Sequence, residues 1–291
     1  MIRQKVLVLG STGMLGHQVV NYFLQFDKYE IVDIAYKNKL TDNTIIVNVT
    51  NKELLGKTIV DIKPDFIVNC IGVLINGANQ DIANAIYINA YLPHKLKNIA
   101  KNINAKLIHI STDCVFSGKR GQYIESDEKD GKDIYAQTKS LGEVIDNVNL
   151  TFRTSIIGPE LKTNGEGLFH WFMQQSGAIN GFTKAIWSGV TTLELAKAVH
   201  WAIENDIRGL YHITNNSSIS KYELLMLFKK YTKKQIEINK IGGKDIDKSF
   251  IDTRKELDYQ IPSYEVMIEE MIELIKSKPK LYGQYMKYIN V

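Results

Sequence analysis

The sequence predicts an α/β protein built on a doubly wound parallel sheet, with a smaller C-terminal lobe. Two observations lead to this expectation. Short apolar runs alternate with amphipathic helical segments through the first half of the chain, and the alternation changes beyond residue 157. Parallel neighbours need long crossover connections, and helices in those crossovers cover both faces of the sheet.

The order of the elements follows from apolar periodicity and from glycine and proline positions. Strands are predicted at residues 5–9, 31–36, 44–47, 66–70, 107–110, 151–157 and 209–214. Helices are predicted at residues 14–26, 51–62, 82–102, 135–147, 193–204, 220–231 and 264–276. Residues 158–190 are rich in glycine and large aromatic residues and are interpreted as loops. We therefore expect a main domain from residues 1–157 and 190–214, and a lobe from residues 158–189 and 215–291.

Composition excludes several classes of protein. A net charge of +4 over 291 residues, with scattered basic positions, argues against a nucleic-acid binder. Two cysteines far apart form neither a disulfide framework nor a metal site, and the histidines follow no metal-ligand spacing. The sequence shows no signal peptide and no apolar stretch near the ~20 residues of a membrane helix, so a cytoplasmic protein is expected.

A glycine-rich turn follows the first predicted strand and leads into a helix. Its sequence is Gly10-Ser11-Thr12-Gly13-Met14-Leu15-Gly16. Gly10 permits the sharp turn, Gly13 allows a pyrophosphate to approach the backbone, and Gly16 allows close packing of helix on sheet. Glycine turns are common, but a strand before and a helix after favour a Rossmann-type dinucleotide site.

The end of the second strand decides between the two nicotinamide cofactors. An acidic residue there binds the ribose 2′-hydroxyl of NAD, whereas a basic residue accommodates the 2′-phosphate of NADP. We place the strand end at Ala35-Tyr36, followed by Lys37 and Lys39, which favours NADPH. NADH stays open, because Asp33 would become the ribose ligand if the strand ended two residues earlier.

A tyrosine and a lysine lie on one face of a predicted helix. Tyr135 and Lys139 are four residues apart, and a cation beside a phenol lowers the pKa of the phenol. This spacing is frequent on helix surfaces, but the segment Ser111-Thr112-Asp113 follows a strand at the carboxyl edge of the sheet, where α/β proteins bind ligands. A hydroxyl there can hydrogen-bond a substrate carbonyl, so the pattern is typical of hydride transfer to a carbonyl group.

Several segments together resemble the dTDP-4-dehydrorhamnose reductase family of extended short-chain dehydrogenases. They are Ser111-Thr112-Asp113-Cys114-Val115-Phe116-Ser117-Gly118, Tyr135-Ala136-Gln137-Thr138-Lys139, Gly142-Glu143, residues 63–69, Arg153-Thr154-Ser155 and residues 209–212. The spacing GxxGxxG of the first turn is also the form found in this class. The resemblance covers about residues 5 to 230 in the family's order. It implies NADPH-dependent reduction of the C4 keto group of a 4-keto-6-deoxy nucleotide sugar, for a surface polysaccharide such as O-antigen.

The resemblance also implies the residues of the site. Thr112, Tyr135 and Lys139 are expected to be catalytic, and Tyr135 to donate the proton. The residues expected at the cofactor are Gly10, Thr12, Gly13, Met14, Leu15, Gly16, Lys37, Asn48, Cys70, Gly72, Asn89, Ser111 and Lys139. Those expected at the substrate are Val73, Asp113, Val115, Phe116, Tyr135, Arg153, Phe169 and Trp187.

Three departures from the family pattern fall on the substrate side. Cys114 stands where tyrosine is usual, the segment Gly189-Val190-Thr191-Thr192 lacks the usual proline, and the loop 128–133 differs. The sugar and the nucleotide therefore stay open between dTDP- and UDP-linked compounds. Two alternative functions stay open. One is an epimerase or dehydratase that retains NAD, and the other is a non-catalytic regulatory subunit of the same fold. A homodimer is compatible with the sequence, and residues 281–285 dock either on the body or on a partner subunit.

Overall fold

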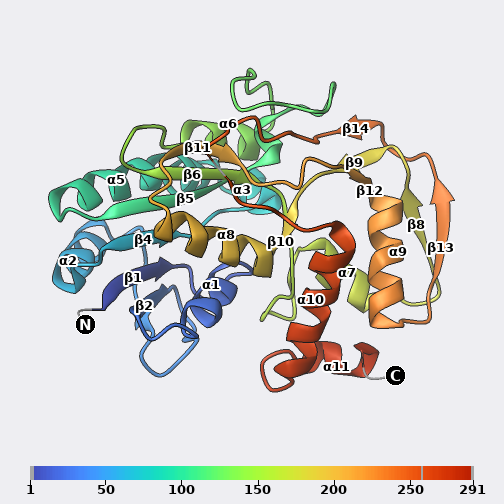
Figure 1. The fold of residues 1–291 in the computed structure, drawn as a ribbon, viewed down its shortest axis with the longest axis horizontal. Coiled ribbons are helices and arrows are strands. Elements are labelled where there is room, and N and C mark those ends of the chain that lie inside the picture. Colours follow the sequence, from blue (N-terminus) through green and yellow to red (C-terminus); the bar gives the residue numbers. More distant parts are fainter. Residues whose placement is uncertain (1–2, 257, 290–291) are drawn as a thin grey trace.

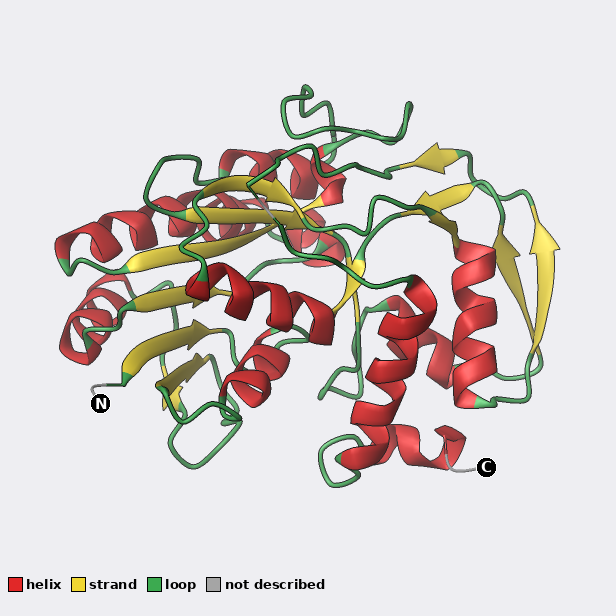
Figure 2. Cartoon of the chain, viewed as in Figure 1, coloured by secondary structure: helices red, strands yellow, loops and turns green. Residues whose placement is uncertain are grey.

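The computed structural model describes residues 3–256 and 258–289 and has the expected α/β fold (Figure 1, Figure 2). Seven parallel strands form the central sheet in the order β11-β6-β5-β4-β1-β2-β3. Their bounds are β1 Gln4–Leu9, β2 Tyr29–Ala35, β3 Ile45–Ile46, β4 Phe66–Asn69, β5 Lys106–Thr112, β6 Leu150–Thr154 and β11 Gly209–His212. The order reverses between β1 and β4, and open α/β sheets bind ligands at the carboxyl ends of the strands beside such a reversal.

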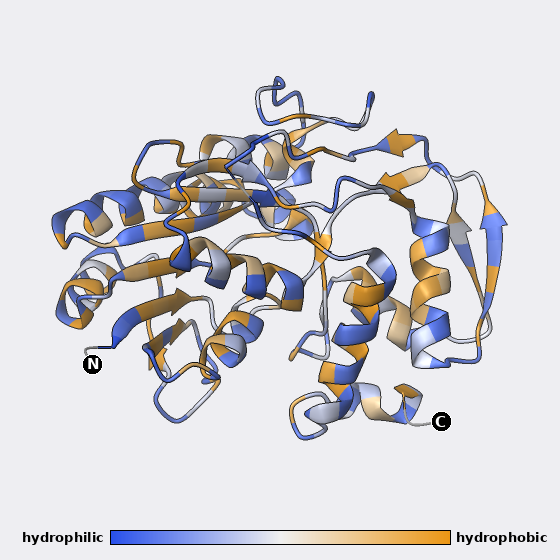
Figure 3. Ribbon diagram, in the orientation of Figure 1, coloured by the Kyte–Doolittle hydropathy of each residue, from blue (hydrophilic) through white to orange (hydrophobic). Residues whose placement is uncertain are grey.

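Alternating residues of the strands bury their side chains on opposite faces of the sheet. Val6 and Val8 of β1 belong to the apolar cluster that contains α1 and α8, whereas Leu7 and Leu9 belong to the cluster that contains α2 and α5. The bounds of these helices are α1 Gly16–Phe23, α8 Thr192–Glu204, α2 Lys52–Ile62 and α5 Leu92–Asn102. The two-sided burial explains the continuous apolar runs of β1 and β4, which are mainly orange in Figure 3.

The segment 158–190 is more regular than its glycine content predicts. It contains α7 Leu168–Gln174, β8 Ala178–Phe182 and β9 Ala185–Trp187, besides the short parallel pair β7 Ile156–Ile157 and β10 Val190–Thr191. The expectation of loops is wrong here because the strands pair with distant partners. β8 pairs with β13 Glu237–Ile241, and β9 pairs with β12 Ile219–Ser220 and β14 Ile246–Asp247.

Two predicted helices have other boundaries than expected. Residues 82–102 form α4 Ile82–Ala85, a π-helical segment Ile86–Tyr91 and then α5, after an unexpected α3 Ile75–Gln80. The helix expected at 135–147 is α6 Ile134–Leu141. A Cβ atom on Gly142 would lie 1.8 Å from the backbone oxygen of Asn89, so glycine is required where α6 ends against the π-helical segment.

The lobe shares its core with the sheet. One buried apolar cluster extends from β1 and α1 into α7, α9 Lys221–Thr232 and α10 Tyr264–Ser277. The chain end docks on the body, because the Tyr282 hydroxyl accepts a hydrogen bond of 2.6 Å from Gln18 of α1 and the Tyr285 hydroxyl lies 2.6 Å from His170. The division of the chain at residues 157, 189 and 214 stays a prediction. No described helix has the length and apolar character that crossing a membrane requires.

Candidate active site

The loops that follow β1, β4 and β5 meet at the carboxyl edge of the sheet. The first is the glycine turn, the second contains Cys70 to Val73, and the third begins with the 3-10 turn Asp113–Val115. Helix α6 packs against the π-helical segment and against this 3-10 turn, and it carries Tyr135 and Lys139. The structure therefore brings together the glycine turn and the three residues expected to be catalytic.

The glycine turn has the geometry that its sequence predicts. Gly10 has a φ of 83°, which a glycine adopts without strain. A Cβ atom on Gly16 would lie 2.1 Å from the Gly10 oxygen, so this position packs helix on strand. A Cβ atom on Gly13 would meet only the Gly10 oxygen, at 3.2 Å, so the space in front of Gly13 is open. The turn is a backbone cradle at the start of a helix, which suits a pyrophosphate.

The second strand ends where the sequence analysis placed it. β2 ends at Ala35, and Tyr36 and Lys37 beyond it are exposed, with the Lys37 ammonium 5.0 Å from the centre of the Tyr36 ring. Lys39 donates a hydrogen bond to the Asp42 backbone oxygen. Asp33 lies inside the strand, in register with Val8, and is 5% exposed. Its position does not fit a ribose ligand at the strand end.

Asn89 ties the β4 loop to the catalytic helix. Its side-chain amide donates to the Val73 oxygen and accepts from the Val73 nitrogen, at 2.9 and 2.8 Å, and it lies 3.3 Å from the Thr138 hydroxyl of α6. Asn89 therefore positions the loop that carries Cys70 and Gly72. Asn48 is exposed beyond β3, and its amide oxygen accepts two hydrogen bonds from Thr50.

Tyr135 and Thr112 form the centre of the site. The Thr112 hydroxyl is 3.0 Å from the Asp113 carboxylate, accepts a hydrogen bond from the Cys114 nitrogen at 3.1 Å and also hydrogen-bonds Tyr135. Burial raises the pKa of Tyr135 above its ordinary value, and the hydrogen bond with Thr112 only partly opposes this effect. The expected lowering of the phenol pKa by Lys139 is thus wrong for this structure. The phenol is protonated at neutral pH and is available as an acid.

Lys139 lies beneath Tyr135, with its ammonium inside the protein. It is 4% exposed and donates a hydrogen bond of 2.7 Å to the backbone oxygen of Ile110 in β5. Burial lowers the pKa of Lys139 to about 8, and the charge of Glu143 partly offsets this effect. Lys139 is therefore charged at neutral pH and loses its proton just above that range.

Arg153 and Ser111 belong to a buried ionic network. Arg153 is 1% exposed and donates two hydrogen bonds of 2.8 Å to the Glu143 carboxylate, and Ser111 donates to the same carboxylate at 2.7 Å. Burial acts to raise the pKa of Glu143, but Arg153 holds it below its usual value. The expected contact of Arg153 with substrate does not fit this position. Glu143, which the sequence analysis noted only as part of a family segment, is the partner that fixes both residues beneath the site.

Three residues expected at the substrate are packed inside the protein. Val115 and Phe116 are 0% exposed, and the Phe116 ring stacks on Tyr123 with a centroid distance of 4.2 Å. Phe169 is 0% exposed and packs against Phe228 in the core of the lobe. These side chains shape the site from behind and have no surface for a ligand. The expectation that these three residues contact the substrate directly is therefore wrong for this structure.

Trp187 borders the site from the lobe. It is 3% exposed, and its indole nitrogen donates a hydrogen bond of 2.8 Å to the Ser155 hydroxyl. A Cβ atom on Gly189 would lie 2.4 Å from its ring, so the glycine makes room for the indole. The ring is held in place and faces the side chain of Lys221, 5.4 Å from its centre.

A segment of the lobe covers the glycine turn. The Glu160 carboxylate accepts a hydrogen bond of 2.6 Å from the Gly167 nitrogen, and a Cβ atom on Gly167 would lie 3.1 Å from the Met14 sulfur. Asn76 of α3 donates a hydrogen bond of 3.1 Å to Glu166 of this segment. The α3 side and the lobe side are thus joined across the edge of the sheet.

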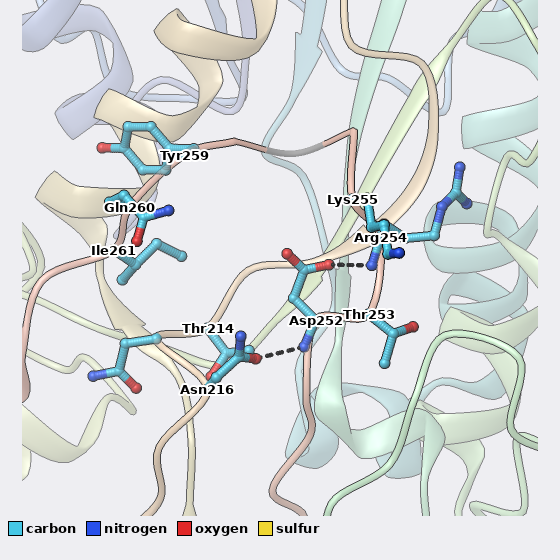
Figure 4. Close-up of a pocket in the computed structure, with 10 residues that line it drawn as sticks. Thr214, Asn216, Asp252, Thr253, Arg254, Lys255, Tyr259, Gln260 and Ile261 are labelled. Atoms are coloured by element: carbon cyan, nitrogen blue, oxygen red, sulfur yellow. Dashed lines mark hydrogen bonds between the residues drawn. The ribbon is translucent and has the colours of Figure 1, made fainter.

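A polar cavity lies outside the site (Figure 4). It has a volume of about 270 Å³ and is lined by Thr214, Asn215, Asn216, Asp252, Thr253, Arg254, Lys255, Tyr259, Gln260 and Ile261. Burial, followed by the neighbouring Glu125, raises the pKa of Asp252 to about 7. None of the three residues expected to be catalytic lines this cavity, in which Asn216 accepts a hydrogen bond from the Asp252 nitrogen and Asp252 accepts one from the Arg254 nitrogen.

Comparison with curated proteins gives relatives of modest identity. The spore coat polysaccharide biosynthesis protein SpsK of Bacillus subtilis is 28% identical over 227 residues, covering 75% of this chain and 76% of that protein. The dTDP-4-dehydrorhamnose reductase of Aggregatibacter actinomycetemcomitans is 26% identical over 141 residues, covering 48% of this chain and 45% of that protein. The beta subunit of methionine adenosyltransferase 2 of Rattus norvegicus is 25% identical over 251 residues, covering 76% and 70%.

Solved structures share the fold. The dTDP-4-dehydrorhamnose reductase of Bacillus anthracis in complex with NADP has a TM-score of 0.80 at 22% identity, covering 94% of this chain and 100% of that one. The UDP-glucose 4-epimerase of Thermotoga maritima with UDP-glucose has a TM-score of 0.78 at 16% identity, covering 94% and 99%. These scores are nearly equal, so the fold does not separate a reductase from an epimerase. The family model described as the RmlD substrate binding domain matches residues 4–249, and the chain therefore belongs to that family.

Proposed function

We propose that this protein reduces the C4 keto group of a 4-keto-6-deoxy nucleotide sugar with NADPH, to make a precursor of a surface polysaccharide. The observation that carries the proposal is the arrangement of Tyr135, Thr112 and Lys139 beside the glycine cradle. The names of two relatives, one a spore coat polysaccharide biosynthesis protein and one a dTDP-4-dehydrorhamnose reductase, support the same class of reaction.

The residues present fit a dinucleotide. The open space before Gly13 would be filled by any larger residue, and the start of α1 presents backbone N–H groups to an anion there. Lys37, exposed just beyond β2, suits a 2′-phosphate and favours NADPH over NADH. When bound, the reduced nicotinamide supplies the hydride.

The chain's own residues supply the proton and hold the substrate. Tyr135, kept protonated by burial, donates its hydroxyl proton to the carbonyl oxygen as the hydride arrives. Thr112 hydrogen-bonds Tyr135 and the developing alkoxide. The hydrogen bond with Thr112 stabilises the tyrosinate that is left, and the charged ammonium of Lys139 suits the ribose hydroxyls of the cofactor. Asp113, 8% exposed and oriented by Thr112, is placed to bind a sugar hydroxyl.

Two other functions are open to the same fold. A dehydratase should carry a further carboxylate beside its threonine, whereas Cys114 follows Asp113 here, and burial raises the pKa of its thiol to about 12. The relative named as the beta subunit of methionine adenosyltransferase 2 suggests a non-catalytic subunit as another candidate function. Complete retention of Thr112, Tyr135 and Lys139 in bonding geometry favours catalysis over that role.

The test is an assay of the purified chain with 4-keto-6-deoxy sugars linked to dTDP, UDP and GDP, each with NADPH and NADH. We expect stoichiometric oxidation of NADPH and a product that NMR identifies as the 4-hydroxy sugar. Conversion of a nucleotide sugar without net consumption of cofactor would identify an epimerase instead. If the chain turns over no sugar of the panel and forms a tight complex with another enzyme, the role of a non-catalytic subunit is favoured.

A further inference from the structure

Two lysines of the lobe lie on either side of strand β9. Ile186 of β9 pairs with Ser220 of β12 on one side and with Asp247 of β14 on the other. Lys221 directly follows β12, and Lys248 directly follows β14. Both interact electrostatically with Asp113 and Cys114, at the turn that follows catalytic Thr112. Three short strands, distant in sequence, thus bring two cations to the substrate side of the site.

Lys221 forms no bonded pair within the described part of the chain. Among residues 3–256 and 258–289, its ammonium has neither a hydrogen-bond acceptor nor an ion pair, and its contact is the Trp187 ring at 5.4 Å. Lys221 is also the first residue of α9, after the N-cap Ser220. The positive end of the helix dipole disfavours a cation there. Burial lowers the pKa of Lys221 to about 8, with the charge of Asp113 opposing the effect.

The charged groups around Lys221 leave it without a bonded counter-ion. Lys248 hydrogen-bonds the thiol of Cys114, which burial keeps protonated. Asp113 carries the facing negative charge, and its carboxylate is already bonded to Thr112. The nearest carboxylate on α9 is Glu223, which is bonded to Ser220 in a capping box. An unpaired, half-buried lysine at a helix N-terminus is unfavourable in several ways, and a bound anion relieves all of them.

We propose that Lys221, assisted by Lys248, binds the diphosphate group of the nucleotide sugar. This inference rests on the proposed function, because it assumes that the sugar's carbonyl lies at Tyr135. The Asp113–Cys114 turn has Tyr135 and Thr112 on its sheet side and the two lysines on its lobe side. A sugar that reacts at Tyr135 therefore directs its anionic end toward Lys221, which donates charge-assisted hydrogen bonds to phosphate oxygens.

Calorimetric titration of the full chain with UDP and dTDP tests the proposal, with the monophosphates and nucleosides as further ligands. We expect Lys221→Met to weaken binding of the diphosphates about 10- to 100-fold and to leave binding of the nucleosides unchanged. Lys221→Arg should retain most of the affinity. Lys229→Met, in the last turn of the same helix, is the matched control and should behave as wild type.

The pH dependence adds a readout that a purely structural role would not change. Wild-type affinity for UDP should be constant from pH 7 to about 8 and then fall, because Lys221 loses its proton there. Asp113, the Cys114 thiol, Lys248 and Asp133 face the same region, and the pKa values of Lys248 and of the thiol are raised, so neither titrates in this window. Lys221→Arg should abolish the fall.

Equal affinity of wild type and Lys221→Met for the diphosphates overturns the inference, and so does an equal loss for diphosphates and nucleosides. If wild type binds the diphosphates through Lys221 but reduces no keto sugar in the panel, the proposed reaction fails and the binding site stands. If wild type binds no nucleoside diphosphate, both are wrong.

Discussion

The two sides of the candidate site hold their cations in different ways. On the sheet side, Lys139 donates to the Ile110 oxygen and Arg153 is doubly bonded to Glu143. On the lobe side, the Lys221 ammonium is bonded to no acceptor among the described residues, and it lies 5.4 Å from the centre of the Trp187 ring. The cations of the sheet side are bonded within the protein, whereas Lys221 on the lobe side has no bonded negative partner among the described residues. On our proposal, the groups that perform the chemistry are fixed before the substrate binds, and Lys221 is paired only when the substrate is bound.

Because of this difference, we expect substitutions on the two sides to change different measured quantities. Substitutions on the sheet side should change the rate of the reaction or the free energy of unfolding. Substitutions on the lobe side should change the affinity for the nucleotide. The following predictions test that separation.

The largest effect is expected for Tyr135→Phe. The ring is retained but no proton can be donated, so kcat should fall about 10²- to 10⁴-fold. Affinity for UDP or dTDP should not change. Steady-state kinetics and calorimetry measure the two quantities, and Tyr87→Phe, which loses a hydroxyl bonded to the Val49 oxygen away from the site, is the control. Full activity of Tyr135→Phe would refute the mechanism.

Arg153→Met should destabilise the protein without changing the affinity for substrate. It leaves the Glu143 carboxylate buried without its main partner, which costs about 3–5 kcal/mol in the free energy of unfolding. Urea unfolding measures this loss, and adding Glu143→Leu should recover part of it. Lys230→Met breaks an exposed pair with Glu265 and should cost less than about 1 kcal/mol. A large rise in KM with unchanged stability would instead show that Arg153 binds substrate.

The pH dependence of Lys139 should act on activity and stability with opposite signs. Its pKa is lowered to about 8 in the folded protein, from 10.5. The charged form supports catalysis, so kcat should fall about fivefold from pH 8 to pH 9. The folded state binds this proton less tightly than the unfolded state, so the contribution of Lys139 to stability rises between about pH 8 and 10.5. A kcat at saturating substrate that stays constant to pH 10 would contradict the role of Lys139.

The smallest effect is expected for Lys37, which is exposed just beyond β2 at the proposed cofactor site. Lys37→Ala should reduce the preference for NADPH over NADH about three- to tenfold, because an exposed ion pair with a phosphate contributes about 1 kcal/mol. Lys39→Ala is the matched control, since Lys39 is already bonded to the Asp42 oxygen. The ratio of kcat/KM for the two cofactors measures the preference. An unchanged ratio in Lys37→Ala would place the 2′-phosphate elsewhere.

Much of the cofactor side could be predicted because its signals are local. The glycine turn, the end of β2 at Ala35 and the spacing of Tyr135 and Lys139 depend on neighbours within a few residues. The assignments of Arg153, Phe116 and Phe169 to the substrate were wrong because sequence shows residue type but not burial. Arg153 finds its counter-charge in Glu143, and the two rings join apolar clusters.

The sequence by itself determined the α/β fold and the glycine turn, and it singled out the candidate catalytic residues, since apolar periodicity and short motifs are properties of contiguous residues. Only the tertiary structure decided the charge state of those residues and the composition of the lobe side. Burial, and not Lys139, controls the pKa of Tyr135. Lys221 and Lys248 reach the site because β9 pairs with strands that follow it by about thirty and sixty residues, and such pairing leaves no local signal.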